Sequence, residues 1–408
     1  MAKGAYIGNA RARKLTKAYI GVNGVARKIK KGYIGVNGVA RMCFGGGDKL
    51  AYYGSSQSYN TGVGSTIVRI MYARESPAAT TYDWGNGEYA IIDGSRNNGT
   101  TPIIDLYDES LVYTTTNSIS GARDTLYPVA VSVGNTALFT KYDGTVAAYG
   151  VSATGSMVES LSVSRMYPGA TTIGDYALFA GGGIDFNKSS GTLYDVVDAY
   201  DKSLTRTTAT SLSIARAGLA ATTIGDYALF AGGKIEVSSS GVSGNKVDCY
   251  DKSLTRLNST VSLYRPRHAL NATTVGDYAI FAGGQYTYDL PDRSFLFSTV
   301  EAYNKSLTRT IAEDMIEGRA YLSSTTLGNY AIFAGGKGFV AGPNERTTEA
   351  KNTVDAYDKS LTRTTQEGIC IARSGSAATT VGDYALFAGG ANPSDNLAMS
   401  AVDAYTLV

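Results

Sequence analysis

A unit that recurs seven times along the chain constrains its fold more than any other feature. The clearest copies read Ala-Ala-Thr-Thr-Ile-Gly-Asp-Tyr-Ala-Leu-Phe-Ala-Gly-Gly, then a loop, then Val-Asp-Ala-Tyr-Asp-Lys-Ser-Leu-Thr-Arg. A period of this size indicates an array of supersecondary units rather than an ordinary globular domain. In five copies the turn glycines are 51, 51, 52 and 54 residues apart, at Gly174, Gly225, Gly276, Gly328 and Gly382. Gly134-Asn135 and Asn86-Gly87 mark two earlier, more divergent copies.

Each unit contains four segments with strand character. In one copy they are residues 219–224, 227–233, 246–251 and 256–263. The Gly225-Asp226 pair between the first two predicts a tight hairpin, because glycine adopts positive φ without steric cost. The Tyr-Ala-Leu-Phe-Ala run is apolar on both faces, which is typical of a strand between two packed sheets. Four antiparallel strands per unit predict an all-β fold in which each unit is one blade of a seven-bladed β-propeller.

The two ends of the repeat array predict a closed ring. The last copy stops at its third strand, residues 402–405, and has no fourth. Residues 66–73 precede the first complete unit and align with the passage that leads from a fourth strand to the next first strand. We therefore predict that residues 66–73 complete the last blade, which removes two exposed sheet edges. An open solenoid is the alternative.

Three recurring features resemble the kelch propeller family over residues 66–408. They are Gly-Gly at the end of the second strand, Val-x-x-Tyr-Asp on the third, and an arginine before the first. The resemblance implies a kelch-type propeller. Kelch repeats usually carry a tryptophan after the third-strand turn, where this chain has Arg206, Arg256, Arg309 and Arg363. The resemblance therefore implies the fold and carries over no particular kelch function.

The charge distribution separates the start of the chain from the rest. Residues 1–46 hold 10 Lys and Arg and no acid, so the other 27 basic residues face all 35 acidic ones, for a net charge of −8. We predict a basic β-hairpin segment over 1–46, a linker over 47–65 and the propeller over 66–408. Three widely spaced cysteines do not suggest a disulfide framework. The sequence shows neither a signal peptide nor a run long enough to insert into a membrane.

A second, smaller repeat fills the basic segment. Residues 18–27 and 32–41 both contain Tyr-Ile-Gly-Val-Asn-Gly-Val-Ala-Arg, and residues 5–9 begin a third copy. Asn-Gly between short β-prone runs predicts hairpins. This repeat looks like segments at the start of tail-associated proteins in phages and prophages of Gram-positive bacteria, which implies attachment to a virion. The docking candidates are Tyr19, Asn23, Arg27, Tyr33, Asn37 and Arg41.

Two other interpretations of this segment stay open. It is a flexible basic tail, or an arm that binds nucleic acid, because Lys and Arg recur with Tyr. The regular Asn-Gly hairpins favour a defined docking element over a loose phosphate-binding tail.

One arginine per unit lies before the first strand, on the face from which the variable loops emerge. First strands line a propeller channel, so these side chains would ring its mouth and bind carboxylate or phosphate. In kelch proteins, which this chain resembles, arginines at this place grip acidic peptides. The alternative is a framework role, in which each arginine ties together the carbonyl groups of neighbouring loops. The seven are Arg74, Arg123, Arg165, Arg216, Arg267, Arg319 and Arg373.

The variable loop 285–298 supplies a second set of candidate ligand-binding residues. Aromatic side chains beside Asp289, Asp292 and Arg293 suit sugar stacking or a protein contact. The alternative is that they fold back on the loop itself. They are Tyr286, Tyr288, Phe295 and Phe297.

The sequence offers little for catalysis. Its single histidine, His268, cannot furnish a multi-histidine metal site, and we expect no metal or cofactor. Boxes of the sialidase type, Ser-x-Asp-x-Gly-x-Thr-Trp, are absent from the sequence. Asp289 and Asp292 would serve a glycosidase only if they were about 5–10 Å apart around a sugar. We therefore expect a non-enzymatic protein.

Together these features predict a phage virion component, either a tail-fibre or baseplate protein or a receptor-binding protein. Residues 1–46 would dock to other virion proteins, and the propeller loops would bind a host-surface glycan or anionic polymer. We expect assembly in the host cytoplasm, several copies in one assembly and no role in nucleic-acid binding. A purely structural decoration or baseplate protein is the alternative, and a glycan-cleaving enzyme is the third possibility.

Overall fold

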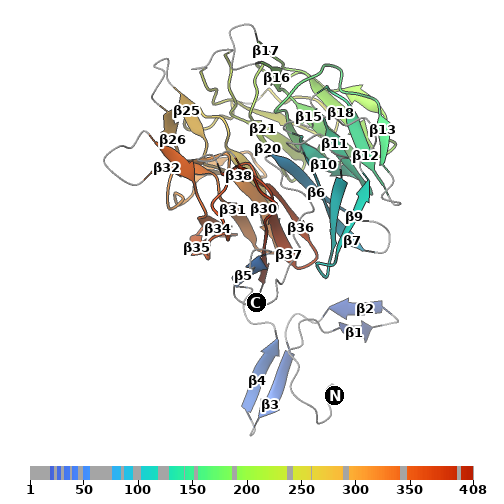
Figure 1. Cartoon of the computed structure of the whole chain (residues 1–408), viewed down its shortest axis with the longest axis vertical. Coiled ribbons are helices and arrows are strands. Elements are labelled where there is room, and N and C mark those ends of the chain that lie inside the picture. The colour runs from blue at the N-terminus through green and yellow to red at the C-terminus, as the bar shows by residue number, and fades with distance from the viewer. Residues whose placement is uncertain are drawn as a thin grey trace. The chain divides into compact units, whose positions relative to one another are not determined.

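A computed structural model describes residues 19–22, 25–28, 32–36, 39–44, 49–55, 76–83, 87–94, 103–117, 128–141, 143–150, 155–185, 191–236, 242–258, 260–287, 294–340, 347–392 and 397–407. Every regular element in these ranges is a β-strand (Figure 1). The chain divides into two compact units, residues 1–49 with 408 and residues 50–407. Within the described ranges no helix has the length and apolarity to cross a membrane.

The first unit contains two antiparallel hairpins where the Asn-Gly repeats predict them. Strand β1 (Tyr19–Val22) pairs with β2 (Val25–Lys28), and β3 (Gly32–Val36) pairs with β4 (Val39–Phe44). Tyr19, Arg27, Tyr33 and Arg41 lie on these strands. Asn23, Asn37 and the copy at residues 5–9 lie outside the described residues. The docking role of this segment stays a prediction.

The larger antiparallel sheets described in the second unit each begin with a hairpin at one of the seven predicted turns. Ile224 pairs with Tyr227, so Gly225-Asp226 is a two-residue turn, and Gly225 has φ +57°. Asp83 pairs with Glu88, which makes the first connection two residues longer. The hairpins are β6 (Pro77–Asp83) with β7 (Glu88–Gly94), β10 (Ala130–Val133) with β11 (Thr136–Thr140), β14 (Gly169–Ile173) with β15 (Tyr176–Ala180), β20 (Ala220–Ile224) with β21 (Tyr227–Ala231), β23 (Asn271–Val275) with β24 (Tyr278–Ala282), β30 (Ser323–Leu327) with β31 (Tyr330–Ala334), and β36 (Ala377–Val381) with β37 (Tyr384–Ala388).

A third strand, and in most sheets a fourth, extends each hairpin outward. In the copy with β20, residues 256–263 make only the isolated bridges Tyr250↔Arg256 and Lys246↔Ser262, so the fourth strand predicted there is not regular. The outer strands are β8 (Ile103–Asp108) and β9 (Tyr113–Asn117), β12 (Val146–Tyr149) and β13 (Gly155–Val158), β18 (Val197–Asp201) and β19 (Arg206–Thr208), β22 (Val247–Tyr250), β27 (Val300–Asn304) and β28 (Arg309–Ile311), β34 (Val354–Asp358) and β35 (Arg363–Gln366), and β40 (Val402–Leu407) with β5 (Leu50–Ser55).

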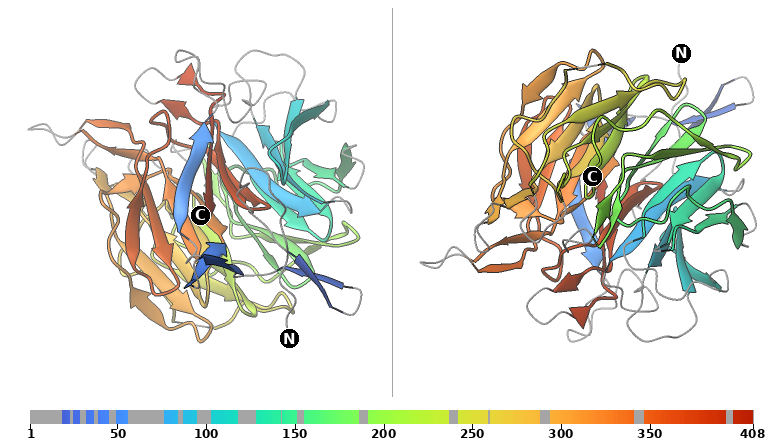
Figure 2. Two further views of the ribbon diagram at one scale, coloured as in Figure 1. Left: turned by 90° about the horizontal axis from the view of Figure 1, so that it is seen from below. Right: turned by 90° about the horizontal axis from the view of Figure 1, so that it is seen from above.

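The last sheet corrects one prediction. Its fourth strand is β5, which pairs with the C-terminal strand β40, and Leu50 lies opposite Leu407. Residues 66–73 therefore do not hold this place, and they lie outside the described residues. The hydroxyl of Tyr52 donates to Asp403 at 2.7 Å, and its ring packs on Tyr405 at 5.3 Å between centroids. The N- and C-terminal parts of the second unit thus share one sheet (Figure 2). The second unit therefore begins at residue 50, whereas the predicted propeller begins at residue 66.

Neighbouring sheets pack face to face through apolar side chains. A typical interface joins Leu178 and Val197 of one sheet to Phe230 and Tyr250 of the next. Phe230 and Tyr250 meet edge to face, with ring centroids 5.7 Å apart. Threonines connect the inner strands as well: Thr171 and Thr223 share a hydrogen bond of 2.9 Å. Between β36 and β6 the same kind of bond joins Thr379 and Thr81 at 2.6 Å.

Several of the loops that follow the second strands form small ribbons of two or three strands, although their sequences share no pattern. Their first residues also bridge to the passage before the first strand, as in His268↔Gln285 and Ser374↔Ala391. Variable loops and passages thus emerge at the same end of the strands, as predicted. The ribbons are β16 (Gly183–Ile184) with β17 (Thr192–Leu193), β25 (Gln285–Thr287) with β26 (Ser294–Leu296), β32 (Lys337–Phe339) with β33 (Thr348–Ala350) and β29 (Arg319–Ala320), and β38 (Ala391–Asn392) with β39 (Leu397–Ala398).

Candidate functional site

Five of the predicted arginines are described, and all five are buried inside the sheets. Arg165, at 1 % exposure, donates to Asp198 at 2.7 Å and to the carbonyl of Phe179 at 3.1 Å. Burial lowers the pKa of Arg165, and the charge of Asp198 opposes that shift. The same pairing recurs in Arg216–Asp248, Arg267–Glu301, Arg319–Asp355 and Arg373–Asp403.

This burial favours the framework role for the arginines. Each guanidinium is held by an acid on the third strand of its own sheet, so its charge is directed inward and not toward a ligand. The sequence contains a sign of this pairing, because the acid of Val-Asp-Ala-Tyr recurs as regularly as the arginine. Arg74 and Arg123 lie outside the described residues.

The arginines at the kelch tryptophan position complete this charge network. Arg363 donates to the other oxygen of Asp355 at 3.2 Å, and it reaches Glu313, in the connection from the preceding sheet, at 3.2 Å. Arg206 likewise joins Asp198 and Glu159. In two sheets a tyrosine hydroxyl takes this place, at Tyr52 on Asp403 and at Tyr113 on Asp105. The substitution therefore has a structural use, which is to link neighbouring sheets.

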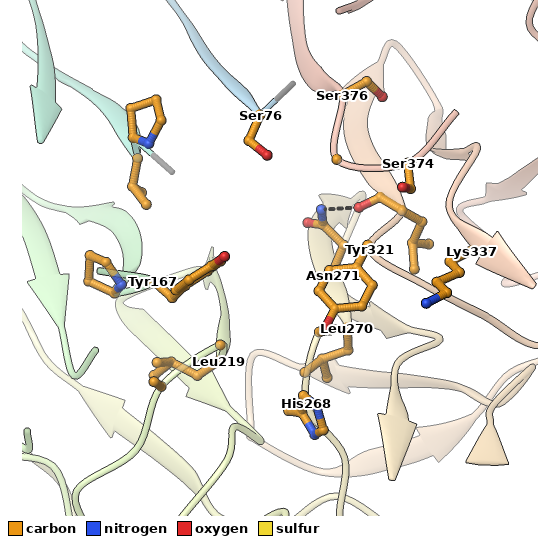
Figure 3. A pocket seen from close by; sticks show the side chains of 18 of the residues that line it. Ser76, Tyr167, Leu219, His268, Leu270, Asn271, Tyr321, Lys337, Ser374 and Ser376 are labelled. Carbon is orange, nitrogen blue, oxygen red and sulfur yellow. Dashed lines mark hydrogen bonds between the residues drawn. The ribbon is translucent and has the colours of Figure 1, made fainter. Parts of the chain in front are cut away.

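A pocket of about 600 Å³ lies where the inner strands begin, at the same end as the ribbons. Figure 3 shows Tyr167 and Tyr321 on opposite sides of it, with His268 and Lys337 among the residues that line it. Asn271 lies at the start of β23 and donates to the carbonyl of Leu322 at 2.7 Å, which links two neighbouring inner strands. Several sheets therefore build this one site.

Residues with a left-handed backbone conformation form the rim of this pocket. Tyr167, Gly218, Ala269, Tyr321 and Gly375 stand two positions after the buried arginines, with φ between 53° and 67°. Each N–H after the first donates to the carbonyl of the preceding rim residue, at 2.9–3.1 Å. Left-handed tyrosine is costly, and such strain is concentrated at functional sites. The two rim tyrosines, Tyr167 and Tyr321, are therefore candidate ligand-binding residues.

His268 connects the pocket to its surroundings through both ring nitrogens. Nδ1 lies 2.8 Å from the hydroxyl of Ser243, and Nε2 lies 2.9 Å from the amide nitrogen of Gln285. The same amide nitrogen donates to the hydroxyl of Tyr321 at 3.2 Å. Burial, aided by the charge of Lys234, lowers the pKa of His268 to about 4. The imidazole is therefore neutral at pH 7, with Nε2 accepting from Gln285 and Nδ1 donating to Ser243.

The pocket is cationic. Lys234, at 5 % exposure, and the half-buried Lys337 line it, whereas none of its described lining residues is Asp or Glu. Burial lowers the pKa of Lys234. Outside residues 1–46 the chain carries a net charge of −8. The charge of the pocket is thus opposite in sign to the net charge of residues 47–408.

The predicted loop aromatics that are described do not line this pocket. Tyr286 pairs with Phe295 across the β25–β26 ribbon, and Phe295 is 49 % exposed. Arg265 lies over the rings of Phe297 and Tyr264, at 5.9 and 5.6 Å from their centroids. Tyr288, Asp289 and Asp292 lie outside the described residues. The ligand-binding role of these aromatic side chains stays a prediction.

Sequence reasoning missed the residues that line the pocket, although a signal for them exists. The position two residues after each arginine changes between copies, from Tyr to Gly, Ala, Tyr and Gly, while the adjoining first strands hardly change. A side-by-side comparison of the repeats would have separated Tyr167 and Tyr321 from the framework.

Comparison with known proteins gives a fold and no family. No protein-family model matches the chain. No curated protein matches its sequence. Among solved structures, it is similar to YjhT, a β-propeller protein, with a TM-score of 0.54 and 11 % identity over 83 % of this chain and 97 % of YjhT. At this identity the likeness shows a β-propeller fold alone.

Proposed function

We propose that the chain is a non-enzymatic phage virion component that binds a host-surface glycan or anionic polymer in the pocket at the mouth of its propeller. The single observation that carries this proposal is a cationic, tyrosine-lined pocket in an otherwise acidic body. Such a pocket concentrates anions by electrostatic steering, and tyrosine rings supply surfaces for sugar. In this proposal the pocket residues bind the ligand, and the five described arginines belong to the framework.

We also propose that the propeller has seven blades and is closed. The inner strands lie against one another in the order β6, β10, β14, β20, β23, β30 and β36, and β36 lies against β6. The Thr81–Thr379 bond across that last junction supports closure. Strand β5 supports it further, because it joins the start of the unit to its C-terminal strand.

The position of Leu50 suits a virion anchor at residues 1–46. Leu50 pairs with Leu407, whose side chain lies beside the turn at Gly328. That turn is at the opposite end of the inner strands from the pocket. The chain therefore enters the second unit at Leu50, at the end of the strands opposite to the variable loops. The resemblance of its repeats to phage tail proteins supports the virion assignment.

A binding role accounts for the pocket better than a catalytic one. None of its described lining residues is a carboxylate that could act as general acid or base. His268 already uses both nitrogens, on Ser243 and Gln285.

A structural role within the particle is the second candidate, and one surface favours it. Tyr264, at 60 % exposure, stacks with Arg265 and Arg309 beside Phe297. Exposed tyrosine and arginine are typical of protein–protein contacts.

Binding of the full chain to intact cells of candidate Gram-positive hosts, at rising salt, tests the proposal. We expect saturable binding that weakens with salt, and Lys337→Met should weaken it and reduce its salt dependence. The control is Lys305→Met, which removes an exposed lysine paired with Asp277 at the opposite end of the strands. Absence of binding to every host, or equal loss in both variants, would favour the structural role.

A further inference from the structure

We infer that Tyr167 and Tyr321 form a clamp for one ring of the ligand, and that His268, acting through Gln285, is the positioning residue for Tyr321. This inference rests on the proposed function and adds to it a specificity-determining pair of side chains. The single histidine of the chain thus takes part in ligand recognition without contacting the ligand itself.

The clamp follows from the order of residues on the rim. Tyr167 and Tyr321 occupy equivalent positions three steps apart, and the two rim residues between them are Gly218 and Ala269. The next residue beyond Tyr321 is Gly375. Two large rings therefore stand among small neighbours, on opposite sides of the pocket (Figure 3). A ligand that stacks on these tyrosines needs a ring with an apolar face and polar edges, which in a surface polymer is a pyranose.

The backbone keeps both tyrosines in place. The N–H of Tyr321 donates to the carbonyl of Ala269 at 2.9 Å, and the carbonyl of Tyr167 accepts from Gly218 at 3.1 Å. A side chain held on a fixed rim loses less conformational freedom on binding, so more of its contact energy appears as affinity.

The side chain of Tyr321 is positioned by a chain of polar groups from three repeats. Nδ1–H of His268 donates a hydrogen bond to the hydroxyl of Ser243, and Nε2 accepts one from the amide of Gln285. The second N–H of the same amide donates to the hydroxyl of Tyr321. This use of both amide hydrogens requires that Nε2 be an unprotonated acceptor. Burial keeps it so, because His268 is only 9 % exposed. Gln285 therefore has one preferred orientation, and Tyr321 has one preferred hydroxyl position.

The binding test uses the full chain and intact host cells as the probe. Tyr321→Ala and Tyr167→Ala should each weaken binding about tenfold or more, as expected for a lost stacking ring. Tyr264→Ala is the matched control, because it removes an exposed tyrosine outside the pocket, and it should bind as the unaltered chain does. Unchanged binding in both clamp variants overturns the clamp and leaves the proposed function intact.

A double-mutant cycle tests the positioning role. Gln285→Met keeps the length of the side chain and removes its hydrogen bonds, so it should weaken binding severalfold in the unaltered chain. In the Tyr321→Ala background it should have no further effect, because it acts through Tyr321. A general structural role would instead give independent losses in the two backgrounds, and that result overturns the positioning role.

The single histidine provides a readout that needs no ligand. In full chain labelled with ¹⁵N-histidine, we expect a neutral ring with the proton on Nδ1 at pH 7, and a shift of the Nε2 signal in Gln285→Met. An unshifted signal overturns the relay. If the unaltered chain binds no host cells, the proposed function and the clamp both fall, and this signal then decides whether the relay stands.

Discussion

Arg165 donates a hydrogen bond of 2.7 Å to Asp198 while both side chains are fully buried between packed sheets. Asp198 also accepts from the backbone and hydroxyl of Ser162, in the connection from the preceding sheet. One carboxylate thus holds the start of a first strand, the third strand of the same sheet and a neighbouring connection together. The repetition of this arrangement in five sheets explains why arginine and acid recur at fixed places in the sequence.

Removing one partner of this pair should be costly. Asp198→Ala leaves the Arg165 guanidinium buried without its counter-charge, and we expect a loss of about 3–5 kcal/mol in the free energy of unfolding. Asp175→Ala is the control, because Asp175 pairs with Lys202 on the surface and is 70 % exposed. Denaturant unfolding of both variants checks the prediction. Similar stability for the two would show that the buried pair is not a main support of the fold.

Because β5 is the fourth strand of the last sheet, two truncations on either side of it should differ sharply in stability. A chain that begins at Lys49 retains β5 and should fold, because the second unit starts at Leu50. A chain that begins at residue 56 leaves the edge of β40 unpaired and exposes Tyr405, so it should aggregate or melt at a markedly lower temperature. Circular dichroism melting and size-exclusion chromatography compare them. Equal melting would mean that β5 contributes little to the propeller.

The hydroxyl of Tyr52 allows a finer test of the same junction. Tyr52→Phe removes the hydrogen bond to Asp403 and keeps the ring on Tyr405. Because the acceptor is charged, we expect a loss of about 1.5–3 kcal/mol in the free energy of unfolding. Tyr53→Phe, at a neighbouring residue that is 40 % exposed, is the comparison variant and should change stability less. The reverse order would contradict the role given to Tyr52.

His268 should make stability depend on pH in a defined window. Its pKa is about 4 in the folded protein, lowered by burial and by Lys234 from the ordinary value of 6.5. The unfolded chain therefore binds a proton that the folded chain does not between pH 6.5 and pH 4. The contribution of His268 to the free energy of unfolding is complete above pH 6.5. It is lost as the pH falls to 4, and the total loss is about 3 kcal/mol. His268→Gln should remove this part of the pH dependence in chemical denaturation, and an unchanged slope would refute it.

The repeat pattern predicted the inner part of each sheet well, because the relevant signals are local. A glycine turn between two apolar strands specifies a hairpin, as at Gly225. The outer edge of the last sheet was harder to predict, since its fourth strand, β5, comes from the other end of the second unit. At the outer edges of the sheets, Arg206 and Tyr52 both satisfy a third-strand acid, so residues of different type fill equivalent places. Alignment by sequence likeness therefore selected residues 66–73 instead of 50–55.

The candidate site was hard to predict for a related reason. Its residues, such as Lys234, Gln285 and Tyr321, come from different repeats and meet only when the sheets are arranged around the pocket. The arginines looked like ligand-binding groups because they recur near the variable loops, whereas the acids that neutralise them lie 30 to 36 residues further along the chain. The pairing register of the strands decides which acid meets which arginine, and the repeat pattern alone does not specify that register.

A crystal structure of the full chain with a purified fragment of the host-envelope polymer tests the central claim most directly. We predict that one sugar ring lies between Tyr167 and Tyr321, with a negative group of the polymer near Lys234 or Lys337. Density for the fragment at the surface around Tyr264 and Arg265, with the pocket unchanged, would contradict the claim and would assign recognition to the outer ribbon.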